Sequence, residues 1–322
     1  MDNIKTLQQA VIYFKDYEHC HALMVLLRWP DGKVTCPQCG SAKVTYLAKN
    51  RVWKCYGGHS RPKFSLKTDT IFEDSPLGLD KWLTTLWLLV NCKNGISSLE
   101  IHRAIGVTQK TAWFMAHRLR LALQAGGFGK LSGEVEVDET FIGGKSRNMH
   151  KAERERKITG TGGKDKAIAM GMVERGGKVR VFHADTRRKK ELQAYIRDHI
   201  EAGSAIFSDA LKSYDGLNND YLHAVVDHAV EYVRGNVHTN TMENFWSLLK
   251  RGLHGTYISV EPFHLFRYLD EQAFRYNNRK EMKDQGRFIL ALSQVGGKRL
   301  TYKKLTGKDQ EFPTQPNTET TT

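Results

Sequence analysis

The sequence predicts an α/β protein in which a small metal-bound module and a helical segment precede a domain of strands and helices. Three observations support this fold class. Cysteines recur at metal-ligand spacing from residue 36, helical periodicity extends from about 79 to 123, and strand-like runs with Gly turns begin at 134. A chain of 322 residues is long enough for about two domains with a substantial core.

The composition indicates an anionic partner. The formal net charge is +14 and the pI is about 9.5. Basic residues interleave with Trp, Tyr and His along the chain, which favours double-stranded DNA or another nucleic acid over a general effect on solubility. A basic surface without a partner is the alternative.

Neither secretion nor a membrane location is expected. The first twenty residues lack a charged region followed by a long apolar run. The most apolar stretch, residues 82–90, is far shorter than the ~20 residues that span a bilayer. Five cysteines, three of them clustered, argue against a disulfide framework and favour the reducing cytoplasm.

Local patterns divide the chain into segments. Residues 1–30 read as one or two amphipathic helices, and residues 31–74 read as short strands and turns. Helices fill 79–123 with breaks at "NGIS" and "IGVT", and 126–133 is expected to be a linker. The remaining elements are strands at 134–144, 165–177, 178–186 and 205–211, with a helix at 188–203.

The signal for regular structure fades after Lys280, and the polar residues 309–322 are expected to be disordered. These patterns predict an N-terminal module with helices and clustered cysteines, a helical segment, a domain of strands and helices and a tail that is first basic and then polar. Their expected limits are 1–75, 76–128, 129–285 and 286–322.

The clustered cysteines are spaced as zinc ligands. "CPQCG" places Cys36 and Cys39 in a C-x2-C turn, and "CYGGH" places Cys55 and His59 in a C-x3-H arrangement. Three thiolates and an imidazole form a closed structural site for one Zn2+, and the intervening fifteen residues suit the hairpin of a zinc ribbon. A redox role for C-x2-C would need a βαβ context, which the sequence lacks.

Residues 96–123 have the spacing of a helix-turn-helix. Leu99, Ile101 and Ala104 would pack the first helix, "IGVT" supplies the turn, and Thr108 would cap the second helix. Two helices that only build the core would show a similar pattern. The candidates for contacts to DNA bases stand at the start of the second helix: Gln109, Lys110 and Thr111.

Two acidic residues stand on expected strands. In "EVEVDETF", Val135 and Val137 alternate with Glu136 and Asp138, so that the acidic side chains take the face opposite the valines. In "AIFSDAL", Asp209 ends an apolar strand. An Asx turn would also explain an Asp at that position.

A third carboxylate, Glu243, flanks the apolar stripe of an expected helix. The stripe has helical spacing: Met242, Phe245, Trp246 and Leu249. A capping box would explain Glu243, with Asn240 as N-cap and Glu243 at N3. A metal ligand is the other explanation. Two strand carboxylates and one helix carboxylate suit two-metal phosphoryl transfer, because hard Mg2+ prefers carboxylate oxygens and two ions clamp the attacking and leaving oxygens.

The order of several motifs resembles that of a bacterial insertion-sequence DDE transposase with an N-terminal zinc ribbon, of the ISXO-two-like group. The resemblance covers residues 25–280, roughly, and is highly specific. The motifs are "RWPDG…CPQCGS", "FSLKTDTIFEDSPL", "VEVDETFIGG", "FSDALKSYDGL", "HTNTMENFWSLLKRGLHGTY" and "RYLDEQAFRYNNR".

The resemblance implies a ribonuclease H-like catalytic domain, a mixed sheet with flanking helices, in which Asp138, Asp209 and Glu243 bind two Mg2+ or Mn2+ ions. Many ribbons of this group end in a second C-x2-C, whereas this chain has "CYGGH", so His59 departs from the pattern. An Asn also occurs in place of, or beside, the final carboxylate in this group, and Asn240 therefore remains a candidate.

Other residues near these motifs have candidate roles. His238 is expected to contact substrate or to stabilise the turn. Lys250 and Arg251 follow Glu243 by about two turns, where a DNA phosphate would approach; an exposed cationic helix end would place them equally well. Glu139 is expected to point to the face opposite Asp138.

Residues 143–166 contain eight Lys or Arg against three Asp or Glu. We expect a flexible loop that clamps the DNA backbone, although a solvated loop without function has the same composition. Its candidate DNA contacts are Lys151, Arg154, Arg156 and Lys157.

The sequence therefore predicts a transposase that binds the terminal inverted repeats of its element, cleaves there and joins the 3′ hydroxyl to target DNA. At least a dimer is expected on DNA, associated with the bacterial nucleoid. A DNA-binding regulator with an inactive ribonuclease H-like domain and a metal-dependent nuclease without strand transfer are the alternatives. All three carboxylates are present, which favours an active enzyme.

Overall fold

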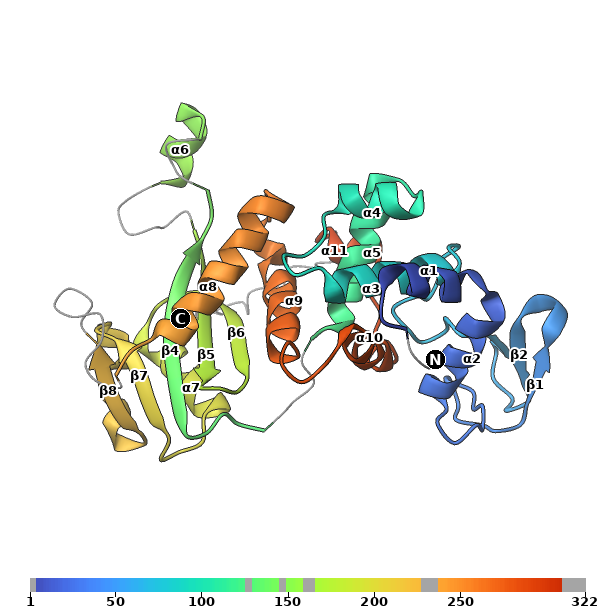
Figure 1. The fold of residues 1–322 in the computed structure, drawn as a ribbon, viewed down its shortest axis with the longest axis horizontal. Coiled ribbons are helices and arrows are strands. Elements are labelled where there is room, and N and C mark those ends of the chain that lie inside the picture. Colours follow the sequence, from blue (N-terminus) through green and yellow to red (C-terminus); the bar gives the residue numbers. More distant parts are fainter. Residues whose placement is uncertain (1–3, 125–128, 145–148, 159–165, 227–236, 309–322) are drawn as a thin grey trace, which may run out of the picture. The chain divides into compact units, whose positions relative to one another are not determined.

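A computed structural model of the chain divides into two compact units whose segments interleave along the sequence (Figure 1). The first unit comprises Met1–Leu86, Ile101–Ala122 and Leu290–Thr322; the second comprises Trp87–Glu100 and Leu123–Ile289. No helix in the described part of the chain has the length and hydropathy of a membrane span. The residues that the structure describes are 4–124, 129–144, 149–158, 166–226 and 237–308.

The first unit begins with the two expected helices and a small sheet. Helix α1 (Leu7–Lys15) starts at Thr6 and α2 (Tyr17–Arg28) starts at Asp16, and each of these side chains caps its helix. Trp53 lies at the centre of the sheet and stacks on Phe64 with 5.7 Å between ring centroids. The antiparallel strands, in spatial order, are β1 (Val44–Leu47), β2 (Val52–Cys55) and β3 (Lys63–Phe64).

The expected helix breaks at "NGIS" and "IGVT" are confirmed. Thr108 accepts a hydrogen bond from the Thr111 amide (3.2 Å), which confirms the cap of the second helix. Ile101 is buried as expected, but Leu99 and Ala104 are exposed, so the packing prediction for those two is wrong. The helices of this region are α3 (Leu79–Asn91), α4 (Ser98–Ile105) and α5 (Gln109–Ala122).

Regular structure also continues where the sequence signal fades. Helix α10 (Asp284–Ser293) and helix α11 (Tyr302–Leu305) follow Lys280, and Leu292, Val295 and Leu305 are buried. The expected tail is therefore folded as far as residue 308, because apolar residues spaced too sparsely for a periodic pattern still reach the core. The disorder expected for 309–322 lies outside the described residues.

The second unit is built on a mixed five-stranded sheet of order β6-β5-β4-β7-β8. Strand β5 pairs antiparallel with both β6 and β4, whereas β4 pairs with β7 and β7 pairs with β8 in parallel. The strands are β4 (Glu134–Ile142), β5 (Ala167–Glu174), β6 (Val179–Ala184), β7 (Ala205–Asp209) and β8 (Leu222–Val226).

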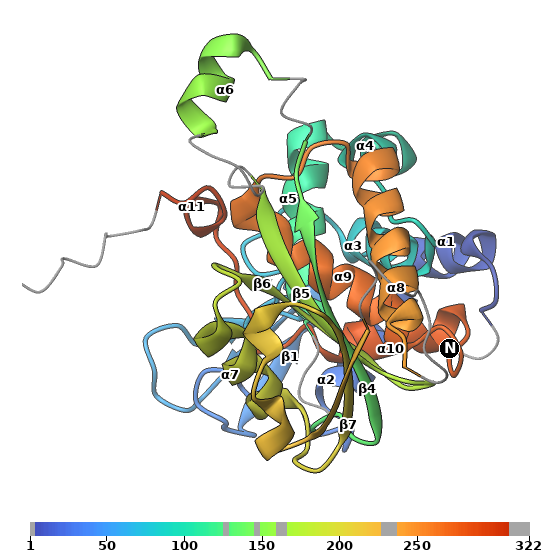
Figure 2. The ribbon, with the colours of Figure 1, turned by 90° about the vertical axis from the view of Figure 1, so that its left-hand side faces the viewer.

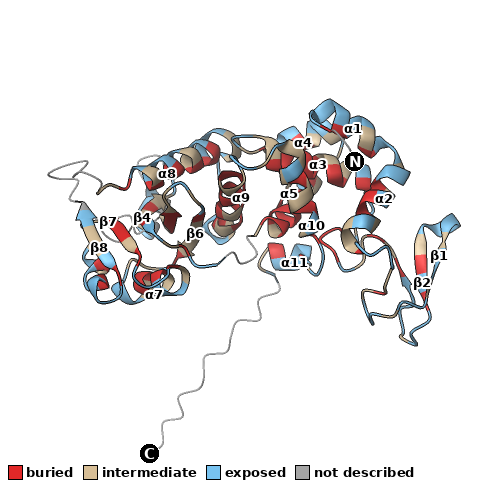
Figure 3. Ribbon diagram, turned by 60° about the horizontal axis from the view of Figure 1, so that its bottom comes forward, coloured by how far each residue is buried: buried red, intermediate tan, exposed pale blue. Residues whose placement is uncertain are grey.

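Helices cover both faces of this sheet (Figure 2). On one face α7 (Lys189–His199) packs through Leu192 and Ile196 against the valines of β4. On the other face lie α8 (Asn240–Gly252), whose buried residues alternate with exposed ones, and α9 (Leu265–Asn277), which is buried along most of its length (Figure 3). The side chains of β4 therefore alternate between two cores, one on each face of the sheet, and not between a core and solvent.

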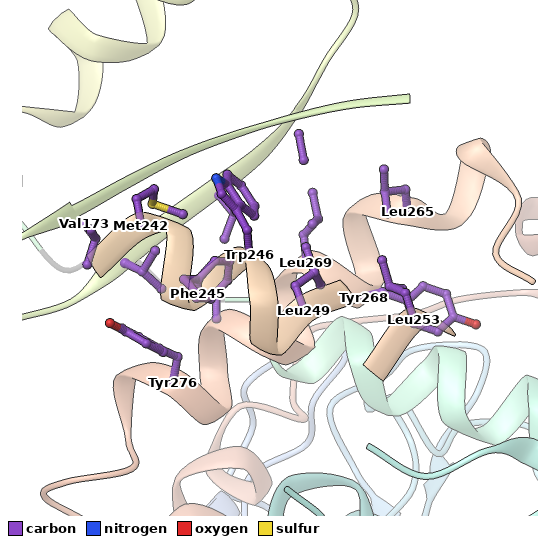
Figure 4. Close-up of a cluster of buried hydrophobic side chains, with 14 residues drawn as sticks. Val173, Met242, Phe245, Trp246, Leu249, Leu253, Leu265, Tyr268, Leu269 and Tyr276 are labelled. Carbon is purple, nitrogen blue, oxygen red and sulfur yellow. The ribbon is translucent and has the colours of Figure 1, made fainter. Parts of the chain in front are cut away.

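Met242 and Trp246 of helix α8 point toward the sheet (Figure 4), and they lie directly over Gly171 of β5. A Cβ atom at this position would lie 2.3 Å from Met242 Cε and 2.8 Å from Trp246 Cζ2. Phe245 and Leu249 complete the buried stripe of α8, as its spacing predicts. The absence of a side chain at 171 therefore sets how closely α8 lies over β4 and β5.

Two expectations about connecting segments are wrong in part. Within the expected basic loop, α6 (Lys151–Lys157) forms a helix, since consecutive Lys, Glu, Arg and Ala residues have high helix propensity. Within the expected linker, Leu131 is buried, and its backbone bonds those of His199 and Glu201. Residues 125–128, 145–148 and 159–165 lie outside the described part of the chain.

Replacing Gly171 by Ala is expected to destabilise the second unit by about 1–3 kcal/mol, because the new methyl group overpacks the interface between α8 and β5. Urea unfolding followed by Trp fluorescence measures the change. Gly129→Ala serves as the control, because a Cβ there meets nothing within 4 Å. Equal midpoints for the two variants would contradict the close approach of α8.

Candidate functional site

The zinc ligands expected from sequence lie together in the first unit. Cys36 Sγ lies 3.3 Å from His59 Nε2, and Cys39 Sγ lies 3.6 Å from Cys55 Sγ. All four ligand atoms are within 4.8 Å of one another. In the described part of the chain, this is the one group of three or more Cys, His, Asp or Glu side chains gathered so closely.

Tight backbone turns bring these ligands together. The amide of Gly40 donates to the carbonyl of Cys36 (2.8 Å) in a turn that places Gly40 at φ +70°, a conformation that glycine adopts without strain. Gly57 is as constrained, because its amide donates to Cys55 Sγ (3.2 Å) and a Cβ there would lie 2.8 Å from Cys39 Sγ. The lack of space for a side chain at Gly57 explains one of the two glycines in "CYGGH".

The chemistry of the ligand set fits zinc. Burial raises the pKa of the Cys36 thiol, but hydrogen bonds from the Gln38 and Cys39 amides outweigh this effect and bring the pKa to about 7. A thiolate is therefore accessible near neutral pH, as metal binding requires. Three sulfurs and one imidazole leave no open position, so the site is structural.

In the second unit, the sheet register places two acidic residues side by side. Strand β4 pairs with β7 in parallel at Glu134 with Ala205 and at Glu136 with Phe207. Continued by two residues, the same register sets Asp138 beside Asp209, and both residues share the face that α8 covers.

Burial makes the Asp138 carboxylate hard to ionise. Burial and the nearby charges of Glu139 and Asp209 raise its pKa to about 7. The indole N–H of Trp246 opposes this shift by donating to Asp138 Oδ2 (2.9 Å). Helix α8 thereby orients the first carboxylate of the candidate site.

Glu139 points away from Asp138, as expected from the strand alternation. Tyr214 donates to Glu139 Oε2 (2.6 Å), and Arg187 lies 3.6 Å from Oε1. Burial raises the pKa of Glu139, while the Tyr214 hydrogen bond and Arg187 act in the opposite direction. Both partners lie on the α7 side of the sheet, so the Glu139 carboxylate is already bound by Tyr214 and Arg187 on the face opposite Asp138.

The start of α8 is held by a residue that sequence reasoning overlooked. Glu136 of β4 is completely buried and accepts hydrogen bonds from the Thr241 amide (2.8 Å), the Met242 amide (3.0 Å) and the Thr241 hydroxyl (2.9 Å). Arg175 Nε donates to the same carboxylate (2.9 Å). His238 Nδ1 lies 3.3 Å from Glu136, which supports the role expected for His238 in stabilising the turn.

The capping-box explanation of Glu243 is wrong in its residues. Thr239 is the N-cap, its side chain makes no capping hydrogen bond, and Asn240 is the first helical residue. Glu136 supplies the cap from a distant strand instead. The sequence holds one signal for this role: Glu136, the second residue of "VEVDET", lies on the same face of the strand as Asp138.

Glu243 lies in the first turn of α8 with its side chain exposed. Lys250 is half-buried and Arg251 is exposed in the last turn of the helix. Asp138 and Asp209 interact electrostatically, but the three carboxylates are not gathered within 4.8 Å like the zinc ligands.

The expected DNA contacts lie on helix ends and surfaces. Gln109 and Lys110 are exposed at the start of α5, and Thr111 is half-buried. Lys151, Arg154 and Arg156 are exposed on α6. The side chain of Lys157 lies outside the described part of the structure.

A structural zinc centre and a sheet with paired strand carboxylates define a zinc-ribbon protein with a second, carboxylate-based candidate site. An ISXO2-like transposase domain matches residues 130–277, and a transposase zinc-ribbon domain matches residues 15–57. His59 lies just beyond the ribbon match, although it joins the ligand cluster.

A similar protein is described as an uncharacterised protein in the transposable element ISH50 of Halobacterium salinarum. It is 30% identical over 242 residues, which cover 72% of this chain and 81% of that protein. The chain belongs to the ISXO2-like family of insertion-sequence transposases.

About one zinc per chain is expected in the purified protein, and His59→Ala is expected to weaken zinc binding by more than the roughly 10–100-fold that removal of an outer partner costs. Competition with a chromogenic chelator measures the affinity. The exposed His19 belongs to the same unit but not to the cluster, so His19→Ala should bind zinc normally. Unchanged affinity in His59→Ala would remove His59 from the ligand set.

A second prediction concerns pH. Because the pKa of Asp138 is raised to about 7, the folded protein without divalent ions at this site keeps a proton that the unfolded chain releases near pH 4. The free energy of unfolding therefore falls as pH rises from about 4 to about 7. Asp138→Asn is expected to stabilise the protein at about pH 8, by up to roughly 4 kcal/mol, and to do so much less at about pH 5.

Urea unfolding at the two pH values, without added Mg2+ or Mn2+, measures this difference. The exposed Asp185 provides a control, because Asp185→Asn removes a surface carboxylate that is not among the groups acting on Asp138. A stabilisation by Asp138→Asn that does not depend on pH would contradict the raised pKa.

Proposed function

We propose that this chain is a DNA transposase that binds the terminal inverted repeats of an insertion sequence, cleaves the phosphodiester bonds there and joins the freed 3′ hydroxyl to target DNA. The observation that carries the proposal is the parallel pairing of β4 with β7, because the same register continued by two residues brings Asp138 next to Asp209. The negative charge of Asp209 also helps to raise the pKa of Asp138. Glu243 completes the proposed triad from α8. Hydrogen bonds to Glu136 and from Trp246 to Asp138 attach this helix to β4.

The strand order supports a ribonuclease H-like catalytic fold. Three antiparallel strands lead into two parallel ones, and the first strand of the unit lies at the centre of the sheet. The central strand and its parallel neighbour each supply one Asp to the same face. In this arrangement, the chain can bring carboxylates from distant positions to one edge of the sheet.

The proposed roles follow from the side chains present. Asp138, Asp209 and Glu243 would hold two Mg2+ or Mn2+ ions, which supply charge neutralisation at phosphorus and activation of a water or 3′ hydroxyl. Ionised Asp138 is needed for such binding, and the Trp246 N–H keeps its carboxylate oriented toward α8. Lys250 and Arg251 in the last turn of α8 would contact phosphates of the bound strand.

DNA binding is proposed for three parts of the chain. Gln109, Lys110 and Thr111 would contact base edges from the start of α5. Lys151, Arg154, Arg156 and Lys157 would contact the backbone through α6, a helix instead of the flexible clamp expected from sequence. Synapsis of two element ends would require at least a dimer on DNA.

Reaction products distinguish the proposal from its two alternatives. Incubation with a duplex from the element's end and Mg2+ should give cleaved ends and joined products, resolved on a sequencing gel. A nuclease without strand transfer would give cleaved ends alone. A regulator with an inactive catalytic domain would bind the duplex and cut nothing.

Glu243→Gln is expected to retain folding and DNA binding but to reduce cleavage by at least about 100-fold, the scale of removing one electrostatic interaction with a transition state. Asn240→Ala is the matched control on the same helix, because Asn240 is exposed and is not the N-cap. Retained cleavage in Glu243→Gln together with its loss in Asn240→Ala would transfer the role to Asn240.

A further inference from the structure

We propose that helix α11 and the lysines that follow it form a DNA-backbone contact of the first unit, continuous with the start of α5. The proposal rests on the DNA binding proposed above and adds a surface that lies outside the helix-turn-helix. The surface, which we term the α11 surface, consists of Lys110, Tyr302, Lys303, Lys304 and Lys308.

The C-terminal segment runs along α5 and is anchored to the first unit. Lys298 Nζ donates to the carbonyl of Leu121 (3.1 Å), at the last turn of α5. Further along the segment, Tyr302 packs edge-on against Phe114 with 5.8 Å between ring centroids. The segment therefore follows α5 from its C-terminal end back toward its start, where the expected base contacts lie.

Helix α11 is held firmly enough to present side chains in fixed positions. Leu305 is completely buried, and the Thr301 hydroxyl accepts a hydrogen bond from the Lys304 amide (3.2 Å) as the helix cap. The ammonium group of Lys110 lies 5.0 Å from the centre of the Tyr302 ring. Tyr302 thus joins the first turn of α5 to α11 through one cation–π contact and one aromatic contact.

The charges of this region leave an excess of cations. Arg299 lies 2.5 Å from Asp74 and 3.9 Å from Glu73, so it pairs with the nearby acidic side chains. Lys303, Lys304 and Lys308 are exposed, and none has an ion-pair partner among the described residues. Together with Lys110, three lysines without an ion pair in the described part of the chain attract a polyanion.

The shape next to these lysines suits a sugar–phosphate backbone. A groove of about 450 Å³ is lined by apolar side chains that include Phe114 and Tyr302, together with Lys110, Thr111, Arg118 and Asp74. Arg299 pairs with the Asp74 carboxylate, and the exposed Tyr302 ring offers an apolar surface beside the lysines that would contact phosphates. Since Thr111 and Lys110 are also expected to read DNA, one duplex can reach both surfaces.

The test uses the full-length, zinc-loaded protein and two duplexes of equal length, one from the element's end and one of random sequence. Lys303→Ala, Lys304→Ala and Lys308→Ala are combined in one variant, and Tyr302→Ala forms a second variant. Fluorescence anisotropy measures Kd at several KCl concentrations between about 50 and 200 mM. Zinc content and thermal unfolding verify that each variant is folded.

We expect the triple variant to bind both duplexes more weakly, with the slope of log K against log salt reduced by about 0.9 for each phosphate that the variant no longer neutralises. Tyr302→Ala should weaken both complexes without changing net charge. The charge-matched control replaces Arg188, Lys189 and Lys190, three exposed cations at the start of α7 in the second unit, by Ala and should keep the wild-type slope.

Two results would overturn the proposal. One is an unchanged slope of log K against log salt in the triple variant, which would show that the lysines of the α11 surface do not contact DNA phosphates. The other is an equally weakened control, which would show that overall charge accounts for the effect. Failure of the wild-type protein to bind either duplex would instead overturn the proposed function, so the two failures are distinguishable.

Discussion

The geometry of the candidate site depends on one buried carboxylate, that of Glu136. It accepts two amide hydrogen bonds and one hydroxyl hydrogen bond from the first turn of α8, where a helix otherwise leaves its amides unpaired. Arg175 compensates the charge, because a buried and unpaired carboxylate would cost several kcal/mol. This contact fixes α8 at one end, and Trp246 can then reach Asp138, two positions along the same strand as Glu136.

The neighbouring carboxylates show how the protein tolerates clustered negative charge. Glu139 is balanced on the α7 side by Tyr214 and Arg187, whereas Asp138 receives only the neutral indole N–H among its described side-chain partners. A carboxylate that lacks a cation of its own is suited to accept one from solution. The two faces of β4 thus give adjacent acidic residues different surroundings.

Sequence predicted what depends on short-range spacing. The zinc ligands, the breaks between α3, α4 and α5 and the apolar stripe of α8 all follow from local patterns and are confirmed. The cap of α8 could not be predicted, because Glu136 and Thr241 are far apart in sequence and the adjacent Asn240 offered a local explanation. Folding after Lys280 was missed for a related reason: Tyr302 packs on Phe114 of α5, which is far away in sequence, and the neighbouring Leu305 is buried. The roles of Asp209 and Glu243 remain predictions.

The return of the C-terminal segment to the first unit has a consequence for synthesis of the chain. Phe114 and the rest of residues 1–122 leave the ribosome long before Tyr302 exists to pack on Phe114, because Leu123–Ile289, the larger part of the second unit, is translated in between. Domains that fold during synthesis do so once their residues are available, so the first unit must remain incomplete until the segment that starts at Leu290 has been translated. A translation product truncated before Leu290 would carry the zinc ligands but not the finished unit, and its exposed apolar surface would mark it for degradation.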